Sequence, residues 1–511
     1  RGIGDVYKRQ SVLMVATHEW RKYTILDDDG MKIRLQPGIT GARANIYLQP
    51  FGRKIGPDPA SINAAMIGGI AANNASGMCC GTAQNSYKTI ADIRIVLYDG
   101  TILDTSDEES KKAFKAKHPG IIKEIEQLRD DIKSDTVLDE RIRRKFKIKN
   151  TTGYSINALV DYQDPFDIIK HLMIGSEGTL AFISDITYHT VTDEKYKACA
   201  LMIFETIELA CEAVPLLRES PVSAVELLDR DSIRSVEDDP DAPEYFRTMP
   251  ETACVLLVEI QANEKADMDA RETAVRKAVE TIPTIQPYRF TSDPKEYNFN
   301  WKARKGLLSS VGGLRKTGTT CIIEDVAFPV PRLAEACIAL KALFKKYEYH
   351  DAVLFGHALE GNLHLNFSQD FSTPSEVQRY ADMMDELADI VVNKFDGSLK
   401  AEHGTGRNMA PFVEKEWGEA AYKIMLRIKK IFDPYHLINP GVVINENPKI
   451  HLENLKPLPA VSEIVDKCME CGFCEPNCVS EGLTLSPRQR IVIAREISRL
   501  KAQGENPARL K

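Results

Sequence analysis

Two histidines on either side of a turn are well placed to hold a metal ion. They lie in VLFGHALEGNLHLNF, residues 353–367, where two β-rich runs flank a turn. If Glu360-Gly361 forms a two-residue hairpin loop, His357 lies directly opposite His364. Opposed residues on one face have Cβ atoms roughly 4.5–5.5 Å apart, which suits two imidazoles on one ion. The spacing therefore predicts a two-histidine site on this hairpin.

A glutamate and a third histidine follow in KAEHGTGR, residues 400–407. Glu402 could complete the ligand set, because two histidines and a carboxylate with an open position bind a catalytic divalent metal such as Zn²⁺. An imidazole commonly acts as a general base, so the neighbouring His403 could move a proton. The other interpretation is a pair of hydrogen-bonded core histidines and an exposed glutamate. The residues alone favour neither interpretation.

Four cysteines near the end of the chain predict an iron–sulfur cluster. Cys468, Cys471, Cys474 and Cys478 have the C-x₂-C-x₂-C-x₃-C spacing of bacterial ferredoxins. A zinc ribbon would instead have two separated pairs. Because the fourth cysteine ligates the other cluster in two-cluster ferredoxins, we expect this chain to hold only part of the iron–sulfur domain. The other seven of the eleven cysteines are scattered, which is typical of reduced thiols in the cytoplasm.

Two loops of small residues could approach a ligand closely. Residues 56–90, GPDPASINAAMIGGIAANNASGMCCGTAQNSYKTI, are rich in Gly, Ala, Asn and Ser, and IGSEGTL (174–180) is similar. Such loops let the backbone contact a ligand and present N–H groups to phosphate. The first loop does not match a P-loop, and it does not follow a strand as a dinucleotide-binding G-x-G-x-x-G does. The alternative for the first loop is a Gly/Ala helix packed against a sheet.

The elements that must position these residues alternate between strand and helix. Residues 11–105 read as short strands and turns, residues 107–146 as a charged and solvated helical excursion, and residues 178–191 as a strand. From residue 195 onward, strands and helices alternate as in a separate α+β domain. The expected elements there are strands 197–205 and 255–262 and helices 206–219, 264–282, 374–396 and 415–433.

Bulk composition excludes several classes of protein. A chain of 511 residues is too long for one core, so we expect two to four domains. The net charge of −8 gives no reason to expect a nucleic acid as partner. No stretch approaches the ~18 apolar residues of a membrane span, so any membrane contact would be peripheral.

Four motifs in order make the chain resemble the FAD-linked oxidases of the vanillyl-alcohol oxidase type: GPDPAS, IGGIAANNASG, GSEGTL and the late NPG (439–441). The resemblance covers nearly all of residues 11–445. It implies an α+β fold with a two-subdomain FAD-binding domain of the PCMH type, an α+β substrate domain with an antiparallel sheet, and the start of a helical ferredoxin-like domain. The FAD contacts it implies are Pro57, Asp58, Pro59, Ser61, Gly68, Gly69, Asn73, Asn74, Ser76, Gly77, Gly178, Thr179 and Asn439.

The pattern GHxxxGNLH followed by AEHGTG resembles the D-lactate and D-2-hydroxyglutarate dehydrogenase branch. The resemblance implies that His357, His364 and Glu402 bind the metal and that His403 is the base. NWKARKGL resembles the W-x-x-R segment that gives an arginine to the substrate carboxylate, which points to Arg304; the alternative is a solvated basic run. Asn362 or Asn366 could bind substrate, and Lys302, Lys305 or Lys316 could bind a distal carboxylate.

The implied activity is oxidation of a D-2-hydroxy acid to the 2-oxo acid. The hydroxyl proton would go to His403, the Cα hydride to the flavin, and the electrons through the iron–sulfur cluster to a respiratory quinone or cytochrome. Alternatives are a subunit similar to glycolate oxidase and an inactive fragment or electron-transfer subunit of a larger complex. We expect a cytoplasmic protein, with any membrane contact peripheral and on the inner face.

The expected domains follow from these motifs. Residues 1–10 lack strand or helix periodicity and are expected to be an assembly scar, and nothing before Ser11 matches the RGxGTS-like loop of the family's first subdomain. We therefore expect truncation at both ends. The expected divisions are an FAD-binding domain without its first subdomain (11–192), a substrate domain (193–445), a linker (446–462) and a partial iron–sulfur domain (463–511).

Overall fold

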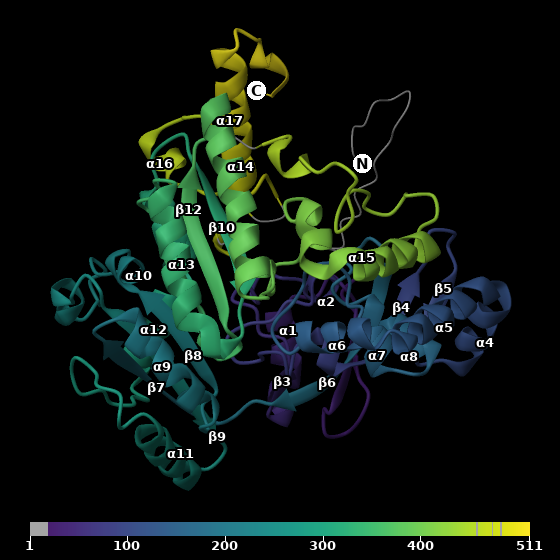
Figure 1. The fold of residues 1–511 in the computed structure, drawn as a ribbon, viewed down its shortest axis with the longest axis horizontal. Helices are drawn as coiled ribbons and strands as arrows, with labels where there is room; N and C mark the ends of the chain where they lie inside the picture. The colour runs from purple at the N-terminus through teal and green to yellow at the C-terminus, as the bar shows by residue number, and fades with distance from the viewer. Residues whose placement is uncertain (1–18, 456–457, 473, 481–482, 511) are drawn as a thin grey trace.

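The computed structural model describes residues 19–455, 458–472, 474–480 and 483–510. In this part the chain is an α+β protein with two six-stranded sheets whose strand pairs are all antiparallel. The strand expected at residues 11–17 lies outside the described residues. Figure 1 shows the two sheets side by side, with the first third of the chain on the right and the middle of the chain on the left.

The first sheet has the order β1-β2-β6-β4-β5, and β3 also pairs with β6. Its strands confirm the β-rich runs predicted near residues 32–38 and 93–103, and Asp99-Gly100 forms the turn between β4 and β5. The prediction of only strands and turns for residues 11–105 was wrong in part, because three short α-helices also lie in the described part of this range. The strands are β1 (Tyr23–Ile25), β2 (Lys32–Leu35), β3 (Arg53–Ile55), β4 (Ile90–Val96), β5 (Ile102–Asp104) and β6 (Phe182–Thr192). The helices are α1 (Gly41–Leu48), α2 (Ile67–Asn73), α3 (Ser86–Thr89), α4 (Glu108–Lys117), α5 (Pro119–Ser134), α6 (Thr136–Lys145), α7 (Ala158–Asp161) and α8 (Pro165–Leu172).

The charged stretch 107–146 is helical as predicted, but it is not a solvated excursion. Ile125, Leu128 and Ile132 of α5 have no exposed surface and belong to the first hydrophobic core. Their spacing of three and four residues places them on one face of the helix. The high overall charge of the segment reflects its outer face and hides this apolar stripe.

The second sheet has the order β10-β12-β11-β8-β9-β7 and is covered on both faces. Along β9, Leu256 and Val258 pack on one side while Val255 and Leu257 pack on the other, so the strand reads as one continuous apolar run. The strands are β7 (Tyr196–Phe204), β8 (Ala224–Asp229), β9 (Cys254–Ala262), β10 (Thr320–Ala327), β11 (Val353–His357) and β12 (Asn362–Gln369). The helices are α9 (Ile207–Arg218), α10 (Arg230–Arg234), α11 (Lys265–Ala278), α12 (Pro294–Leu314), α13 (Leu333–Lys346) and α14 (Pro374–Asp389).

A long helix that follows the second sheet in the sequence packs on the first sheet. Trp417, Ile424 and Ile428 of α15 (Val413–Phe432) lie in the same hydrophobic core as β2, β4 and β6. In Figure 1 this helix runs above the first sheet, while α16 (Glu463–Asp466), α17 (Pro487–Ala502) and the C-terminus lie in the upper part of the view. Among the described residues, no helix combines the length and the apolar character needed to cross a membrane.

Candidate metal and flavin site

The two hairpin histidines meet, although the register differs from the predicted one. In the structure Phe355 lies opposite His364, and the turn is a short 3₁₀ segment, Ala358–Glu360, closed by Gly361 with a φ of +63°. The hairpin loop is therefore longer than the two residues expected. His357 and His364 are diagonal neighbours on one face, which still lies within reach of two imidazoles.

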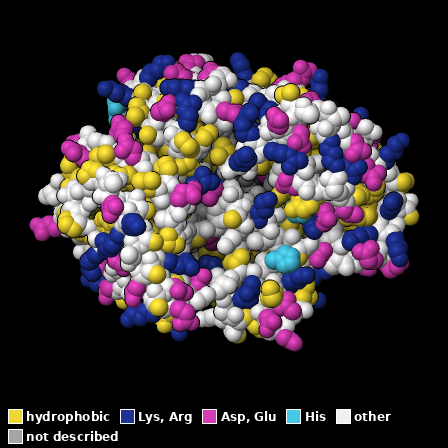
Figure 2. Space-filling model, turned by 60° about the horizontal axis from the view of Figure 1, so that its bottom comes forward, with side chains coloured by type: hydrophobic (Ala, Val, Ile, Leu, Met, Phe, Trp, Pro, Cys, Tyr) yellow, Lys and Arg dark blue, Asp and Glu magenta, His cyan; other side chains and the backbone are white. Residues whose placement is uncertain are grey.

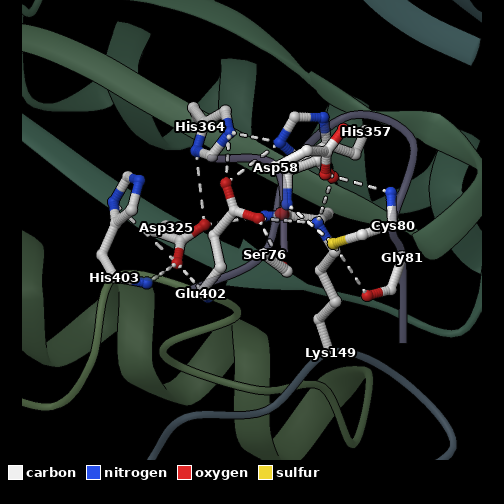
Figure 3. A network of polar contacts seen from close by, with 12 residues as sticks. Asp58, Ser76, Cys80, Gly81, Lys149, Asp325, His357, His364, Glu402 and His403 are labelled. Atoms are coloured by element: carbon white, nitrogen blue, oxygen red, sulfur yellow. Dashed lines mark hydrogen bonds and ion pairs between the residues drawn. The ribbon is translucent and has the colours of Figure 1, made fainter. Parts of the chain in front are cut away.

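These histidines and Glu402 form a compact group of three buried side chains (Figure 3). The Nε2 atoms of His357 and His364 are 3.3 Å apart, and Oε1 of Glu402 lies 3.0 Å from the first and 3.5 Å from the second. Tetrahedral Zn²⁺ with bonds of about 2.0–2.1 Å holds its ligand atoms about 3.3 Å apart. The donor set and its spacing thus fit a divalent metal, and the glutamate is buried rather than exposed.

The two carboxylate oxygens of Glu402 have different surroundings. Oε1 faces the two histidines, whereas Oε2 accepts hydrogen bonds from Nζ of Lys149 at 2.6 Å and from Oγ of Ser76 at 2.8 Å. Burial alone would raise the pKa of Glu402, but Lys149 and His357 beside it hold that pKa well below its usual range. The carboxylate therefore stays ionised, with one oxygen directed at the histidines and the other anchoring the side chain.

Glu226 of β8 links one predicted ligand to the predicted substrate arginine. Its Oε1 lies 2.7 Å from Nδ1 of His357, and its Oε2 accepts from Nε of Arg304 at 2.6 Å. Burial favours neutral forms here, yet Arg304 and His357 together lower the pKa of Glu226, and Glu226 raises the pKa of His357. A carboxylate on Nδ1 fixes the ring so that Nε2 points to the metal position.

Asp325 of β10 organises the other side of the group. Its Oδ1 lies 3.3 Å from Nδ1 of His364, and its Oδ2 accepts the backbone N–H groups of Glu402 and His403 at 2.6 and 2.9 Å. Burial lowers the pKa of His364 to about 4, so this ring is neutral at pH 7 and can donate a lone pair to a metal. The ring of His403 stacks on His364 and is more exposed than the three buried side chains.

Arg304 lies beside this group but is itself buried. Its guanidinium is 4.8 Å from the ring centroid of Phe355, the residue opposite His364. Of the two candidate asparagines, Asn362 donates through Nδ2 to Asp325, while Nδ2 of Asn366 is buried with no hydrogen-bond partner in the described part of the chain. Asn366 is therefore the one with a donor to offer a substrate.

The small-residue motifs converge on the Glu402 loop from distant parts of the sequence. Nδ2 of Asn73 donates to the carbonyl of Glu402 at 2.6 Å, and a Cβ added to Gly404 would lie 2.4 Å from Oδ1 of Asn73. Glu177 in GSEGTL accepts from the backbone N–H of Gly406, and Nδ2 of Asn439 donates to the carbonyl of Glu177. Three of the four motifs thus meet at the Glu402 loop.

Within the first loop the predicted flavin contacts divide into two kinds. Some are used for internal packing: Asp58 accepts from the backbone N–H groups of Cys79 and Cys80, and a Cβ on Gly77 would lie 2.0 Å from the carbonyl oxygen of Asp58. The Gly/Ala helix that was the alternative also exists, as the short helix α2. Pro57, Pro59 and Ser61 lie in the turns that precede it, and Gly68 in α2 packs on Pro37.

Other predicted contacts face open space. A Cβ on Gly69 or Gly178 would meet no atom within 4 Å, which leaves room for a ligand. A cavity of about 620 Å³ adjoins the site and is lined by residues that include Asn74, Ser76 and Lys149. This volume lies within the usual range for cofactor sites. The hydroxyl of Thr179, in contrast, is already bonded to Tyr154 and to the carbonyl of Ser176.

Figure 2 shows the molecule from another side, with a hollow near the middle of the face and acidic and basic side chains interspersed around it. No single sign of charge dominates this face.

The cysteine motif forms one loop between α16 and α17. Cys468 and Cys478 are partly buried, and Cys471 and Cys474 are exposed. Glu470 (φ +66°) and Gly472 (φ +84°) turn the loop, and the N–H of Glu470 donates to Sγ of Cys468 at 3.3 Å. An amide donor to a cysteine sulfur suits a cluster ligand. In the described residues the four sulfurs do not form a group tight enough for a single ion, but a cluster spreads its ligands around several irons.

Three important residues escaped the sequence analysis: Lys149, Glu226 and Asp325. The two acidic residues carried a usable signal, because each interrupts an apolar strand, in SAVELLD and in CIIEDVAF. A carboxylate inside such a strand is costly unless it is paired, so its presence points to a partner. Lys149 in KIKNTTGY has no comparable signal in the sequence alone.

Comparison with known proteins identifies two domains. Residues 193–443 match the family described as FAD linked oxidases, C-terminal domain, and residues 2–106 match an FAD binding domain. The second match includes residues 2–10, the segment expected to be an assembly scar, which lies outside the described residues.

Relatives and one solved structure agree with these matches. The chain is 26% identical to D-2-hydroxyglutarate dehydrogenase of Pantoea ananatis, over 98% of this chain and 52% of that protein. It is 26% identical to the mitochondrial D-lactate dehydrogenase [cytochrome] 1 of Saccharomyces cerevisiae, over 84% of this chain and 63% of that protein. A structure of alkyldihydroxyacetonephosphate synthase shares the fold, with a TM-score of 0.53 and 15% identity over 82% of this chain and 66% of that chain.

The chain spans about half the length of the D-2-hydroxyglutarate dehydrogenases that it matches. By its two matched domains, the chain combines an FAD binding domain with an FAD linked oxidase C-terminal domain, and its sequence is similar to D-2-hydroxyglutarate and D-lactate dehydrogenases.

Proposed function

We propose that the protein oxidises a D-2-hydroxy acid, D-lactate or D-2-hydroxyglutarate, to the corresponding 2-oxo acid. The observation that carries this proposal is the buried group of His357, His364 and Glu402, whose donor atoms lie within 4.8 Å of one another. An arginine and an exposed histidine lie beside it, and a cavity large enough for a cofactor adjoins it. Together these parts could bind a carboxylate, a hydroxyl group and a flavin.

Two cofactors would complete the site. A divalent metal held by His357, His364 and Glu402 would supply Lewis-acid chemistry by lowering the pKa of the substrate hydroxyl group. FAD, held by the small-residue loops at Gly69, Gly178 and the cavity beside Ser76, would supply the redox chemistry by accepting the hydride from Cα.

The protein's own side chains orient the substrate and move the proton. Arg304 would hold the substrate carboxylate through parallel hydrogen bonds, and its position is fixed by Glu226 and Phe355. His403 would accept the hydroxyl proton, since its ring stacks on His364 at the edge of the metal position. Nδ2 of Asn366 would donate to a substrate oxygen, which would satisfy a buried donor that is otherwise unpaired.

The choice between the two acids depends on a cation for a second carboxylate. Of the three candidate lysines, Lys302 already pairs with Asp239 at 3.0 Å, and Lys305 lies over the ring of Trp301. Lys316 lines a separate cavity next to Arg315. Measuring the reaction with each acid must therefore decide between D-lactate and D-2-hydroxyglutarate.

Anaerobic flavin bleaching tests the proposal. FAD- and Zn²⁺-loaded protein would be mixed with D-lactate and with D-2-hydroxyglutarate separately, and the flavin absorbance followed in time. We expect one acid to bleach the flavin, and His403→Ala or a chelator to abolish the effect. His189→Ala, on the other sheet, is the matched control and should bleach normally. A yellow protein that neither acid bleaches would refute the substrate assignment.

We further propose that Cys468, Cys471, Cys474 and Cys478 are iron–sulfur ligands, the first three to one [4Fe–4S] cluster and Cys478 to the other cluster of a two-cluster domain. The bound cluster would carry electrons from the flavin to a respiratory quinone or cytochrome. The ferredoxin spacing and the amide donor to Cys468 support this proposal. Iron and acid-labile sulfide should therefore copurify with the anaerobic protein. Cys471→Ser should lower both, whereas Cys79→Ser, far from the motif, should not. Iron-free protein after anaerobic reconstitution would contradict the assignment.

A further inference from the structure

Two buried arginines from different parts of the chain meet at the carbonyl oxygen of Cys468. Nη2 of Arg315, at the end of α12, donates to this oxygen at 2.9 Å, and Nη2 of Arg495 of α17 donates to it at 2.6 Å. Their exposed fractions are 9% and 4%. Two like charges at one buried acceptor repel each other, so this arrangement calls for a nearby negative charge.

The two arginines differ in the groups that compensate their positive charges. Arg495 pairs with Glu470 at 2.5 Å. Arg315 instead donates to the backbone carbonyls of Gly312, Thr319, Asp466, Lys467 and Cys468, and within the described ranges no carboxylate lies at salt-bridge distance from its guanidinium. Burial lowers the pKa of Arg315, and the nearby Arg495 lowers it further. The guanidinium thus holds the cysteine loop in place without its own charge being neutralised.

The loop also packs closely on α12. A Cβ added to Gly312 would lie 2.5 Å from Sδ of Met469, so the glycine leaves a slot for this methionine between Cys468 and Cys471. Together, Gly312 and Arg315 make the end of α12 the surface on which the cysteine loop packs. The same helix carries Arg304, eleven positions earlier, which is roughly 16 Å along the axis. One rigid helix thus connects the substrate site to the cysteine loop.

We propose that Arg315 is the positioning residue that docks the cysteine loop on α12 and makes its iron–sulfur cluster easier to reduce. This inference rests on the proposed cluster. A [4Fe–4S] cluster with four thiolates is an anion that gains one more negative charge when it accepts an electron. A buried, unneutralised cation beside Cys468 stabilises the reduced form more than the oxidised form, and charge and hydrogen bonds near the sulfurs are known controls of cluster potential. Arg315 therefore favours electron flow from the flavin to the cluster.

A redox titration of the full chain tests the electrostatic role. The reduction midpoint would be followed by the electron paramagnetic resonance signal of the reduced cluster in wild type, Arg315→Met and Arg315→Lys. We expect Arg315→Met to shift the midpoint to more negative potential, and Arg315→Lys, which keeps the charge, to shift it less. Arg234→Met is the matched control, because Arg234 lines the same cavity as Arg315 but is paired with Asp231. Its midpoint should stay near that of wild type.

Hydrogen exchange separates docking from charge. Both Arg315 variants lose the planar fork that binds several carbonyls, so residues 463–472 should exchange faster than in wild type or Arg234→Met. If the reduction midpoint of iron-loaded Arg315→Met equals that of wild type, the proposed electrostatic role of Arg315 is wrong, although the cluster assignment stands. If Arg315→Met fails to fold, the test compares Arg315→Lys, which keeps the charge, with Arg495→Met, which removes a cation beside Cys468. Equally negative midpoints in these two variants would overturn the electrostatic role of Arg315. If the wild-type protein binds no iron, both the proposed cluster and the proposed role of Arg315 are wrong.

Discussion

The buried pair of Lys149 and Glu402 makes a sharp prediction about the protein without metal. The two side chains are 2% and 8% exposed, and Nζ lies 2.6 Å from Oε2. In Glu402→Gln, the carbonyl of Gly77 becomes the remaining partner of the ammonium among the described residues. Because an uncompensated buried charge costs about 3–5 kcal/mol, Glu402→Gln should lower the free energy of unfolding by that order. Lys149→Met should lower it by less, since His357 still lies 3.0 Å from the Glu402 carboxylate.

The double variant distinguishes an ion pair from general packing. Replacing both partners removes both charges, so Lys149→Met/Glu402→Gln should be more stable than the sum of the single changes predicts, by roughly 2–3 kcal/mol. The measurement is urea unfolding in the presence of a chelator, followed by circular dichroism. Lys170→Met is the matched control, since the partner of Lys170, Asp167, is 47% exposed, and its loss should cost about 1 kcal/mol or less. Strictly additive losses in the double variant would refute the reasoning.

Three other outcomes follow from the structure. Burial lowers the pKa of His171 from 6.5 to about 4, so the unfolded state gains a proton before the folded state does as the pH falls. The free energy of unfolding should therefore drop by up to about 3 kcal/mol between pH 6.5 and 4. Thermal unfolding across that range should show a smaller drop for His171→Phe. Gly77→Ala should destabilise the protein strongly, because the new methyl would lie 2.0 Å from the carbonyl oxygen of Asp58. Gly69→Ala should keep the stability of the apoprotein or raise it by about 0.5–1 kcal/mol, yet reduce its flavin content. Equal flavin content in Gly69→Ala and wild type would argue against close approach of the cofactor at Gly69. Arg304→Lys should raise KM for the acid more than it lowers kcat, since an ammonium cannot reproduce the bidentate grip; an unchanged KM in steady-state assays would remove Arg304 from carboxylate binding.

The sequence was most informative where short motifs bring ligands together. His357, His364 and Glu402 were predicted as a group, and the structure places them in contact even though the hairpin register differs. The register error had little effect because diagonal neighbours on one sheet face are still within reach of each other. The helices expected at 206–219, 264–282, 374–396 and 415–433 also lie close to their observed bounds, whereas α12 and α13 were not predicted.

The remaining parts of the site depend on contacts that sequence spacing does not encode. Glu226 reaches His357 because β8 pairs with β11, and these strands are separated by more than a hundred residues. Lys149 reaches Glu402 across 253 positions. The position of α15 is a further example, because its apolar face could have packed on either half of the molecule. Such long-range choices are decided by tertiary packing rather than by local pattern.

The position of α15 also bears on the order in which the chain folds during synthesis. The first core contains residues between Ile33 and Tyr188, but it is completed only by Val413, Trp417 and the rest of α15. At about 5–20 residues per second, the ribosome needs roughly 12–50 s to pass from the end of β6 to the end of α15. The whole second sheet can form in that interval. The half that contains the first sheet therefore keeps one side of its core uncovered while the second sheet, which is encoded after it, folds first. During that interval the nascent chain is most exposed to aggregation and chaperone binding.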